Sequence, residues 1–280
     1  REQQGPLRTC LKLKGTHKNE NGHFFRYIIR LHLFRGKPDI RIDYTFVNDN
    51  AAKTMSQVAS LTCGWKLAGT DPAFYHLEGP RTDPTRLFQV DDRRFRVNNQ
   101  PAGRTASGWA ATWNRQGGIA VGVRHFWQNW PKSLSVGQRG LSVGILPGFA
   151  KGTYDGRPIR DEAKLFYYLR NGEYSFKIGV AKTHEMWATF FTGKPTPETL
   201  DDHFRSRQQR LLAQATPERI AATAVLGEMP PARPGPTAAY DKWFSGFLDK
   251  HIHGQEEVRE YGLLNFGDWY DEKKFGGGWG

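Results

Sequence analysis

The chain is poor in cysteine and in acidic residues, and it has no long apolar run. Only Cys10 and Cys63 are present, so they are either two thiols or one disulfide. Asp and Glu number 28 against 40 Lys and Arg, and the net charge of +12 favours an anionic partner. Because no apolar stretch is long enough to cross a bilayer, we expect no membrane partner.

Several sequence signatures of common sites are also missing. No Cys/His set has the spacing of a zinc site, and Asp39, Asp43 and Asp49 lack the spacing of a calcium loop. There is no Gly-x-Ser-x-Gly turn and no glycine-rich phosphate loop before a helix. The basic residues are scattered and accompany no zinc finger or RNA-binding signature. We therefore expect no nucleic-acid partner and no cofactor, with a calcium ion left open.

Aromatic residues are plentiful, at 13% of the 280 residues, and nine of them are tryptophans. The hydrophobic content of 38% is that of a globular chain, which at this length can bury a sizeable core and hold more than one domain. An acidic polysaccharide would be attracted by the same positive field as a nucleic acid. We expect the partner to be such a polysaccharide or an oligosaccharide derived from it.

The first two thirds of the chain have the pattern of β-structure. Apolar and polar residues alternate from Phe25 to Leu33 and again from Ile40 to Phe46, on either side of a Gly-Lys-Pro-Asp turn. This pattern predicts an antiparallel hairpin with one buried and one solvated face. Further strand-like runs at short spacing predict a mainly β chain, with a large antiparallel β-sandwich over residues 1–192.

Helical signals begin after this region. Thr196-Pro197-Glu198 and Thr216-Pro217-Glu218 each combine a capping hydroxyl, a proline in the first turn and an acidic residue, which predicts two helix starts. After a proline-rich connector, an aromatic helical face extends over residues 240–251. We expect residues 193–280 to form a helical domain that is cut short.

A cluster of aromatic and polar side chains follows the strand that begins near Ile119. Flat apolar rings beside cations and amides suit a sugar that bears a carboxylate. Pro131 sets the local backbone after the strand alternation breaks. We expect five residues of this cluster to form a ledge that binds an acidic glycan: Arg124, Trp127, Asn129, Trp130 and Lys132.

Ordinary structural interpretations of this cluster stay open. His125 shares its side of the strand with the apolar residues from Ile119 to Val123, which is typical of a core histidine. Trp130 could close the edge of the sandwich. On the other side of the strand, Ala120 and Gly122 leave room for something large to lie across the sheet.

Two more segments carry candidate site residues. Lys182-Thr183-His184-Glu185 is expected to interrupt two apolar strands, either as a solvated turn or as a rim that faces the substrate. In the second case, His184 is the proton carrier and Lys182 gives electrostatic support. Near the end of the chain, Asp268 and Trp269 are expected to bind substrate, unless their glycine-rich stretch is only a surface loop.

The order of several short motifs resembles one family. The motifs are Gly5-Pro6-Leu7-Arg8, Arg41-Ile42-Asp43-Tyr44-Thr45-Phe46-Val47, Phe126-Trp127-Gln128-Asn129-Trp130-Pro131-Lys132, Ala181-Lys182-Thr183-His184-Glu185 and Asn265-Phe266-Gly267-Asp268-Trp269. In this order they resemble the exo-rhamnogalacturonan lyase-like (PcRGLX/YetA-like) proteins, over the central β-sandwich and the start of the α/α toroid. The resemblance implies that a first β domain and most of the toroid lie outside these 280 residues.

The resemblance also implies an activity. It is that of a polysaccharide lyase, which cleaves a uronate-containing, rhamnogalacturonan-like polymer such as pectin by β-elimination, in a secreted or periplasmic protein. In this chemistry a cation neutralises the carboxylate, a base removes the C5 proton and the C4 substituent leaves. Two alternatives stay open: a non-catalytic carbohydrate-binding sandwich, and a glycoside hydrolase on the same scaffold.

Overall fold

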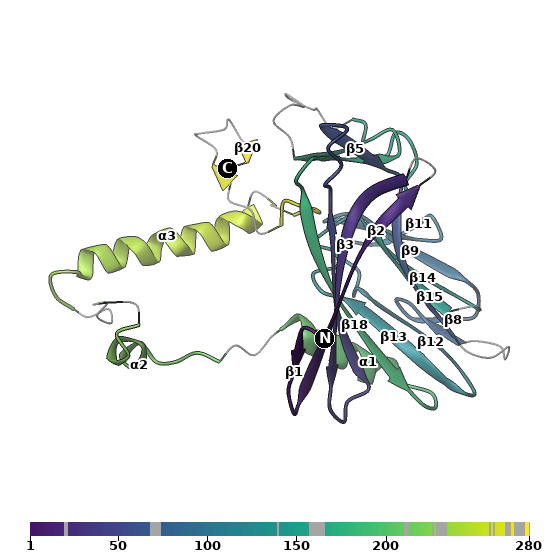
Figure 1. The fold of residues 1–280 in the computed structure, drawn as a ribbon, viewed down its shortest axis with the longest axis horizontal. Coiled ribbons are helices and arrows are strands. Elements are labelled where there is room, and N and C mark those ends of the chain that lie inside the picture. Colours follow the sequence, from purple (N-terminus) through teal and green to yellow (C-terminus); the bar gives the residue numbers. More distant parts are fainter. Residues whose placement is uncertain are drawn as a thin grey trace. The chain divides into compact units, whose positions relative to one another are not determined.

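The computed structural model divides into two compact units, which are described separately (Figure 1). The first unit comprises Arg1–Gln208 and Tyr261–Phe266, and the second comprises Gln209–Glu260 and Gly267–Gly280. The structure describes residues 1–19, 22–67, 74–138, 140–156, 166–209, 213–225, 227, 234–257, 259, 261–266, 270–271 and 278–279.

A nine-stranded antiparallel sheet forms one layer of the first unit, in the order β1-β2-β3-β4-β18-β13-β12-β7-β8. Its strands are β1 Gln3–Gln4, β2 Arg8–Asn19, β3 Gly22–Phe34, β4 Asp39–Val47, β18 Ala181–Phe191, β13 Gly117–Val123, β12 Trp109–Asn114, β7 Phe74–His76 and β8 Pro80–Arg81. The predicted hairpin is confirmed as β3 and β4, which pair in antiparallel register. Gly36 has φ +68° in the turn between them, a conformation that favours glycine.

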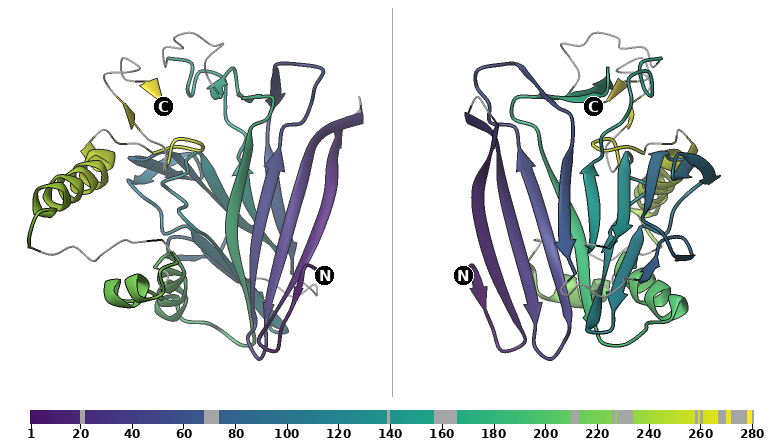
Figure 2. Two further views of the ribbon diagram at one scale, coloured as in Figure 1. Left: turned by 60° about the vertical axis from the view of Figure 1, so that its left-hand side comes forward. Right: turned by 90° about the vertical axis from the view of Figure 1, so that its right-hand side faces the viewer.

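A six-stranded antiparallel sheet forms the second layer, in the order β11-β10-β9-β14-β15-β6 (Figure 2). Its strands are β11 Gln100–Gly103, β10 Arg94–Val97, β9 Thr85–Asp91, β14 Lys132–Gly137, β15 Gly140–Leu146 and β6 Leu61–Lys66. A small sheet of β16 Tyr167–Arg170, β17 Glu173–Lys177 and β5 Met55–Val58 joins the first unit.

The core lies between the two large sheets. Alternate side chains of β4 and β18, such as Phe46 and Met186, pack with Leu87, Leu134 and Val143 of the six-stranded sheet, and all of these are buried. This packing follows from the period of two along each strand, which gathers the apolar residues on one face. The predicted large antiparallel sandwich is thereby confirmed. Its two cysteines are free thiols, and Cys10 is buried.

Among the described residues, three helices follow the sandwich: α1 Pro197–Gln208, α2 Pro217–Ala222 and α3 Ala238–Glu257. The two helix-start signals predict the first two, and the predicted aromatic helical face over residues 240–251 lies in the third. The hydroxyls of Thr196 and Thr216 accept the N–H groups of Thr199 and Arg219, so both predicted caps form. α1 belongs to the first unit, while α2, α3 and the short strands β19 Tyr270–Asp271 and β20 Gly278–Trp279 belong to the second. None of the described helices is long and apolar enough to cross a bilayer.

Candidate functional site

The segment after β13 folds as a series of turns and does not continue the strand. β13 ends at Val123, and the backbone N–H of Arg124 donates to the carbonyl of Glu185 at 2.9 Å. His125 has φ +53°, so the expected strand alternation of Arg124 and His125 was wrong. Asn129 closes the turn, because its side-chain amide donates to the carbonyl of His125 at 2.9 Å.

Three members of the expected ledge lie in the interior, which corrects the prediction of a ledge at the rim. Trp130 is 5% exposed and stacks with Tyr154, Asn129 is 7% exposed, and Lys132 is 1% exposed. The ammonium of Lys132 donates to three carbonyls, those of Asn129, Pro131 and Ile145, at 2.8, 3.2 and 3.0 Å. A lysine can be buried when all of its N–H groups are bonded. Lys132 therefore links the turn after β13 to Ile145 of β15 and does not face a ligand.

Trp127 is half-buried, and its ring meets a returning segment of the chain. Tyr261 lies 4.8 Å from Trp127 between ring centroids, and Phe266 lies 5.0 Å from the ring of His125. The N–H of Gly262 donates to the carbonyl of Gln128 at 2.8 Å. Two of the predicted motifs, far apart in sequence, are thus neighbours in the fold. Of the second motif, Asp268 and Trp269 lie outside the described residues.

Lys182 and His184 do not form a rim, because they belong to one continuous strand, β18, and face the core. They pair across the sheet with Phe46 and Tyr44, which are buried. His184 is 5% exposed, and its Nε2 has no hydrogen-bond partner among the described residues. Burial, and then the nearby Lys132 and Lys182, lower the pKa of His184 well below its usual value. Burial also lowers the pKa of Lys182.

The opposite face of β18 carries a group of polar residues that we call the sheet-face site. Glu185 pairs across the strands with Asp43, and Trp187 pairs with Arg41. Because side chains alternate, these residues point away from the core. The site consists of side chains from β3, β4, β18 and the turn after β13: His32, Arg41, Asp43, Arg124, Glu185 and Trp187.

Arg41, Asp43 and His32 hold one another in place. The guanidinium of Arg41 lies 2.9 Å from an oxygen of Asp43 and 2.9 Å from Nε2 of His32, and that same oxygen lies 3.0 Å from His32 Nε2. Burial, and then the charge of Arg41, lower the pKa of His32. A neutral His32 can accept from Arg41 through Nε2, since guanidinium groups only donate. This bond fixes the orientation of the Arg41 guanidinium.

Glu185 and Arg124 form the other half of the sheet-face site. Glu185 accepts a hydrogen bond of 2.8 Å from the indole N–H of Trp187, and Nη1 of Arg124 lies 3.7 Å from its carboxylate. The side chains of Asp43, Glu185, Arg41 and Arg124 are 13–24% exposed, so they are held by the protein but reach the surface. The Nε donors of Arg41 and Arg124 are buried without partners among the described residues.

Helix α1 covers the neighbouring part of this face. Phe204 packs over Gly122, where an added β-carbon would meet the Phe204 ring at 2.2 Å. The large group that Ala120 and Gly122 leave room for is therefore this helix of the same chain. Asp39 holds α1 to the sheet by accepting from Arg207 and Thr189 at 3.0 and 2.7 Å.

Sequence reasoning missed His32, Arg41, Asp43, Glu185 and Trp187 as site residues. The signal was present, because the first three stand at the polar positions of the predicted hairpin. Those positions were interpreted as an ordinary solvated face. Only the pairing of β4 with β18 brings Asp43 and Arg41 beside Glu185 and Trp187.

A comparison with family models gives one match. Residues 1–65 match the model described as "PcRGLX-like protein central beta sandwich domain". The match supports the predicted resemblance at the level of the family over that segment, which includes β1–β4. No curated protein sequence matches the chain.

Several solved structures share parts of the fold at low identity. They include the Slr1438 protein from Synechocystis sp. PCC 6803, with 12% identity and a TM-score of 0.35 over 68% of this chain and 64% of that one. A galactose mutarotase related enzyme from Lactobacillus acidophilus has 12% identity and a TM-score of 0.30, over 70% and 72% of the two chains. A galactose mutarotase-like protein from Lactobacillus casei ATCC 334 has 13% identity and a TM-score of 0.33, over 67% and 71%. The chain thus spans less than two thirds of the Slr1438 protein, and likenesses of this size carry no argument about activity.

Proposed function

We propose that the sheet-face site binds a uronate residue of an acidic polysaccharide, and that the chain is part of a polysaccharide lyase. The observation that carries this proposal is the arrangement of two guanidinium groups around two opposed carboxylates. Arg41 lies beside Asp43, and Arg124 lies beside Glu185. Paired guanidinium groups suit a sugar that bears a carboxylate.

In this scheme the arginines hold the substrate carboxylate, which makes the neighbouring C5–H more acidic. The carboxylate of Glu185 removes the C5 proton, the electron pair forms the C4=C5 double bond, and the bond from C4 to the leaving oxygen breaks. Water supplies the proton that the leaving oxygen takes up. Lys182 and His184, on the other side of β18, have no role in this scheme.

The carboxylate pair favours a glycoside hydrolase as a second candidate. Asp43 and Glu185 are direct cross-strand partners on one face, which places their β-carbons about 4.5–5.5 Å apart. Retaining glycosidases hold their two carboxyl groups about 5–5.5 Å apart. Asp43 is already bonded to Arg41, however, so its main role is to position that guanidinium. For this reason the lyase ranks first.

The match over residues 1–65 and the motif order support a rhamnogalacturonan-like, pectic polymer as the substrate. The net charge of +12 supports a polyanion in general. Polymers of this kind lie outside cells, and we therefore propose a secreted or periplasmic location. We propose no metal or other cofactor for the reaction, because arginines can do the charge neutralisation that a cation would otherwise provide.

The test compares binding with turnover. We expect Arg41→Met to raise the Kd for a galacturonic acid trisaccharide about tenfold, measured by titration calorimetry at low salt. Glu185→Gln should keep the Kd within about threefold while it lowers product formation from pectic polymer about 100-fold. Arg115→Met, at an exposed arginine in the turn between β12 and β13, is the matched control and should change neither quantity.

The product identifies the reaction. A lyase releases an unsaturated uronate that absorbs in the ultraviolet, and a hydrolase releases new reducing ends without that absorbance. Binding without either product would show that the chain is a non-catalytic carbohydrate-binding module and not part of an enzyme. Equal effects of Arg41→Met and Arg115→Met on binding would overturn the sheet-face site itself.

A further inference from the structure

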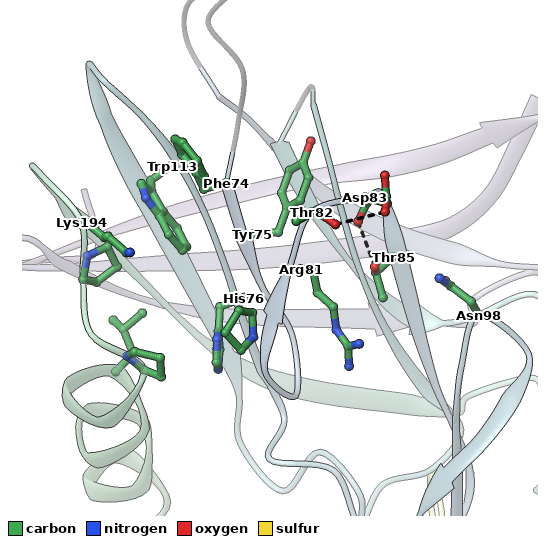
Figure 3. Close-up of a pocket in the computed structure, with 14 residues that line it drawn as sticks. Phe74, Tyr75, His76, Arg81, Thr82, Asp83, Thr85, Asn98, Trp113 and Lys194 are labelled. Atoms are coloured by element: carbon green, nitrogen blue, oxygen red, sulfur yellow. Dashed lines mark hydrogen bonds between the residues drawn. The ribbon is translucent and has the colours of Figure 1, made fainter.

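A pocket lies at the edge of the nine-stranded sheet, where β7 and β8 meet the start of α1 (Figure 3). Its volume is about 540 Å³, and it belongs entirely to the first unit. Small-molecule sites commonly have volumes of roughly 300–1,000 Å³. We call it the edge pocket. It shares no residue with the sheet-face site.

Two aromatic rings form one wall of the edge pocket. Phe74 of β7 and Trp113 of β12 are direct cross-strand partners, and their rings lie 6.0 Å apart with an interplanar angle of 23°. Phe74 is 56% exposed, which is unusual for so large an apolar side chain beside a pocket. Figure 3 shows the two rings side by side, with Lys194 next to Trp113. Such rings suit the flat C–H face of a pyranose.

The back of the pocket is rigid. The ring of His76 stacks on Trp109 at 4.6 Å, and the indole N–H of Trp109 donates to Asp201 of α1 at 3.1 Å. Burial lowers the pKa of His76, so the imidazole in this wall is neutral. Leu200 of α1 is 5% exposed and completes the wall. A ligand would therefore meet a preformed surface, which lowers the entropy cost of binding.

Cationic groups and hydrogen-bond acceptors both line the edge pocket. Arg81 is fixed by bonds of 2.9 and 3.1 Å from Nε and Nη2 to the carbonyls of Leu77 and Glu78. Its Nη1 and the ammonium of Lys194 have no partner among the described residues, so both are available for an anion. Asp83 and Asn98 also line the pocket and offer acceptors for hydroxyl groups.

We infer that the edge pocket binds an acidic glycan, with one carboxylated pyranose ring against Phe74 and Trp113 and its carboxylate at Lys194 (Figure 3). Arg81, Asp83 and Asn98, on the other side of the pocket, bond the next residue of the glycan. The inference rests on the proposed function only in the choice of an acidic glycan. It adds a second site on the same sheet, at a distance along the strand order from β4 and β18. A polymer held at both sites would gain affinity through multivalency.

The test uses the whole chain and two trisaccharides, of galacturonic acid and of galactose. In an Arg41→Met background, which weakens the sheet-face site, Phe74→Ala should raise the Kd for both trisaccharides about tenfold. Phe166→Ala is the control, since Phe166 is 58% exposed outside the pocket, and it should leave both Kd values unchanged. Lys194→Met should raise only the Kd of the acidic trisaccharide, about threefold, and the exposed Lys37→Met should not.

The outcomes separate the two sites. If Phe74→Ala and Phe166→Ala have equal effects, the edge pocket does not bind glycans. If the chain binds the two trisaccharides equally and Lys194→Met affects neither, the carboxylate assignment is overturned. If Phe74→Ala weakens binding while Arg41→Met alone leaves it unchanged, the edge pocket stands and the proposed sheet-face function fails.

Discussion

The two faces of β18 give ionisable side chains opposite environments. On the core face, Lys182 and His184 pair with the buried aromatic residues Phe46 and Tyr44, and burial lowers the pKa of each. On the outer face, Glu185 is bonded to Trp187 and paired with Arg124. A one-residue step along the strand thus separates groups whose pKa burial lowers from a carboxylate held among cations and donors.

The difference teaches that a polar motif on a strand has to be divided between two faces before it is given a function. Lys182-Thr183-His184-Glu185 looks like one unit in sequence, yet its even-numbered members serve the core. Burial also lowers the pKa of Lys132 well below its usual value, and its amine is held by three carbonyl acceptors in place of a carboxylate. The outer face instead pairs its cations with the carboxylates of Asp43 and Glu185.

The largest effect on stability is expected from removal of the core ammonium. Lys132→Met leaves three buried carbonyls without their donor, and we expect the free energy of unfolding to fall by about 3–5 kcal/mol. Urea titration of the purified chain measures this change. The exposed Lys37→Met should stay within about 0.5 kcal/mol of the wild type. A small effect of Lys132→Met would mean that the interior accepts its polar groups without this lysine.

A smaller effect is expected where α1 packs on the outer face. Gly122→Ala places a methyl group against Phe204, and we expect it to cost about 1–3 kcal/mol of unfolding free energy. Combining it with Phe204→Leu should cost less than the sum of the single changes, because the two positions touch. Additive costs in the thermal unfolding of the double variant would show that helix and strand do not pack as described.

The smallest effect concerns pH and the core face. His184 has a lower pKa in the folded chain than the usual 6.5 of the unfolded one, so the unfolded state takes up the extra proton. Its contribution to stability is complete above the unfolded pKa and falls as the pH drops through about 6.5, by up to about 1.4 kcal/mol per pH unit. His184→Leu should flatten the dependence of the urea midpoint on pH between about 5 and 7.

Other histidines keep part of that slope in the His184→Leu variant. Burial lowers the pKa of four more, and these are His17, His32, His76 and His203. His253→Gln, at an exposed histidine of α3, serves as the control and should leave the slope as it is. An unchanged slope in His184→Leu would contradict the neutral state of His184.

Local patterns in the sequence were enough to predict the individual strands and helices. The alternation from Phe25 to Phe46 gave the β3–β4 hairpin, and the Thr-Pro-Glu signals gave the starts of α1 and α2. These features depend on neighbours a few residues apart, through side-chain period, capping and proline geometry. The sequence also predicted the aromatic cluster after β13. It did not predict how exposed these side chains are, because the same rings can pack in a core or bind a ligand.

The amino-acid sequence by itself determined that this protein is a basic, aromatic-rich β-sandwich followed by helices, since period and capping are local properties. Only the tertiary structure decided which polar residues meet. β18 is inserted between β4 and β13, far from β4 in sequence, and that pairing sets Asp43 against Glu185 and turns His184 inward. The order of the strands and the face on which each side chain lies arise from long-range packing, because one arrangement has to suit many side chains at once.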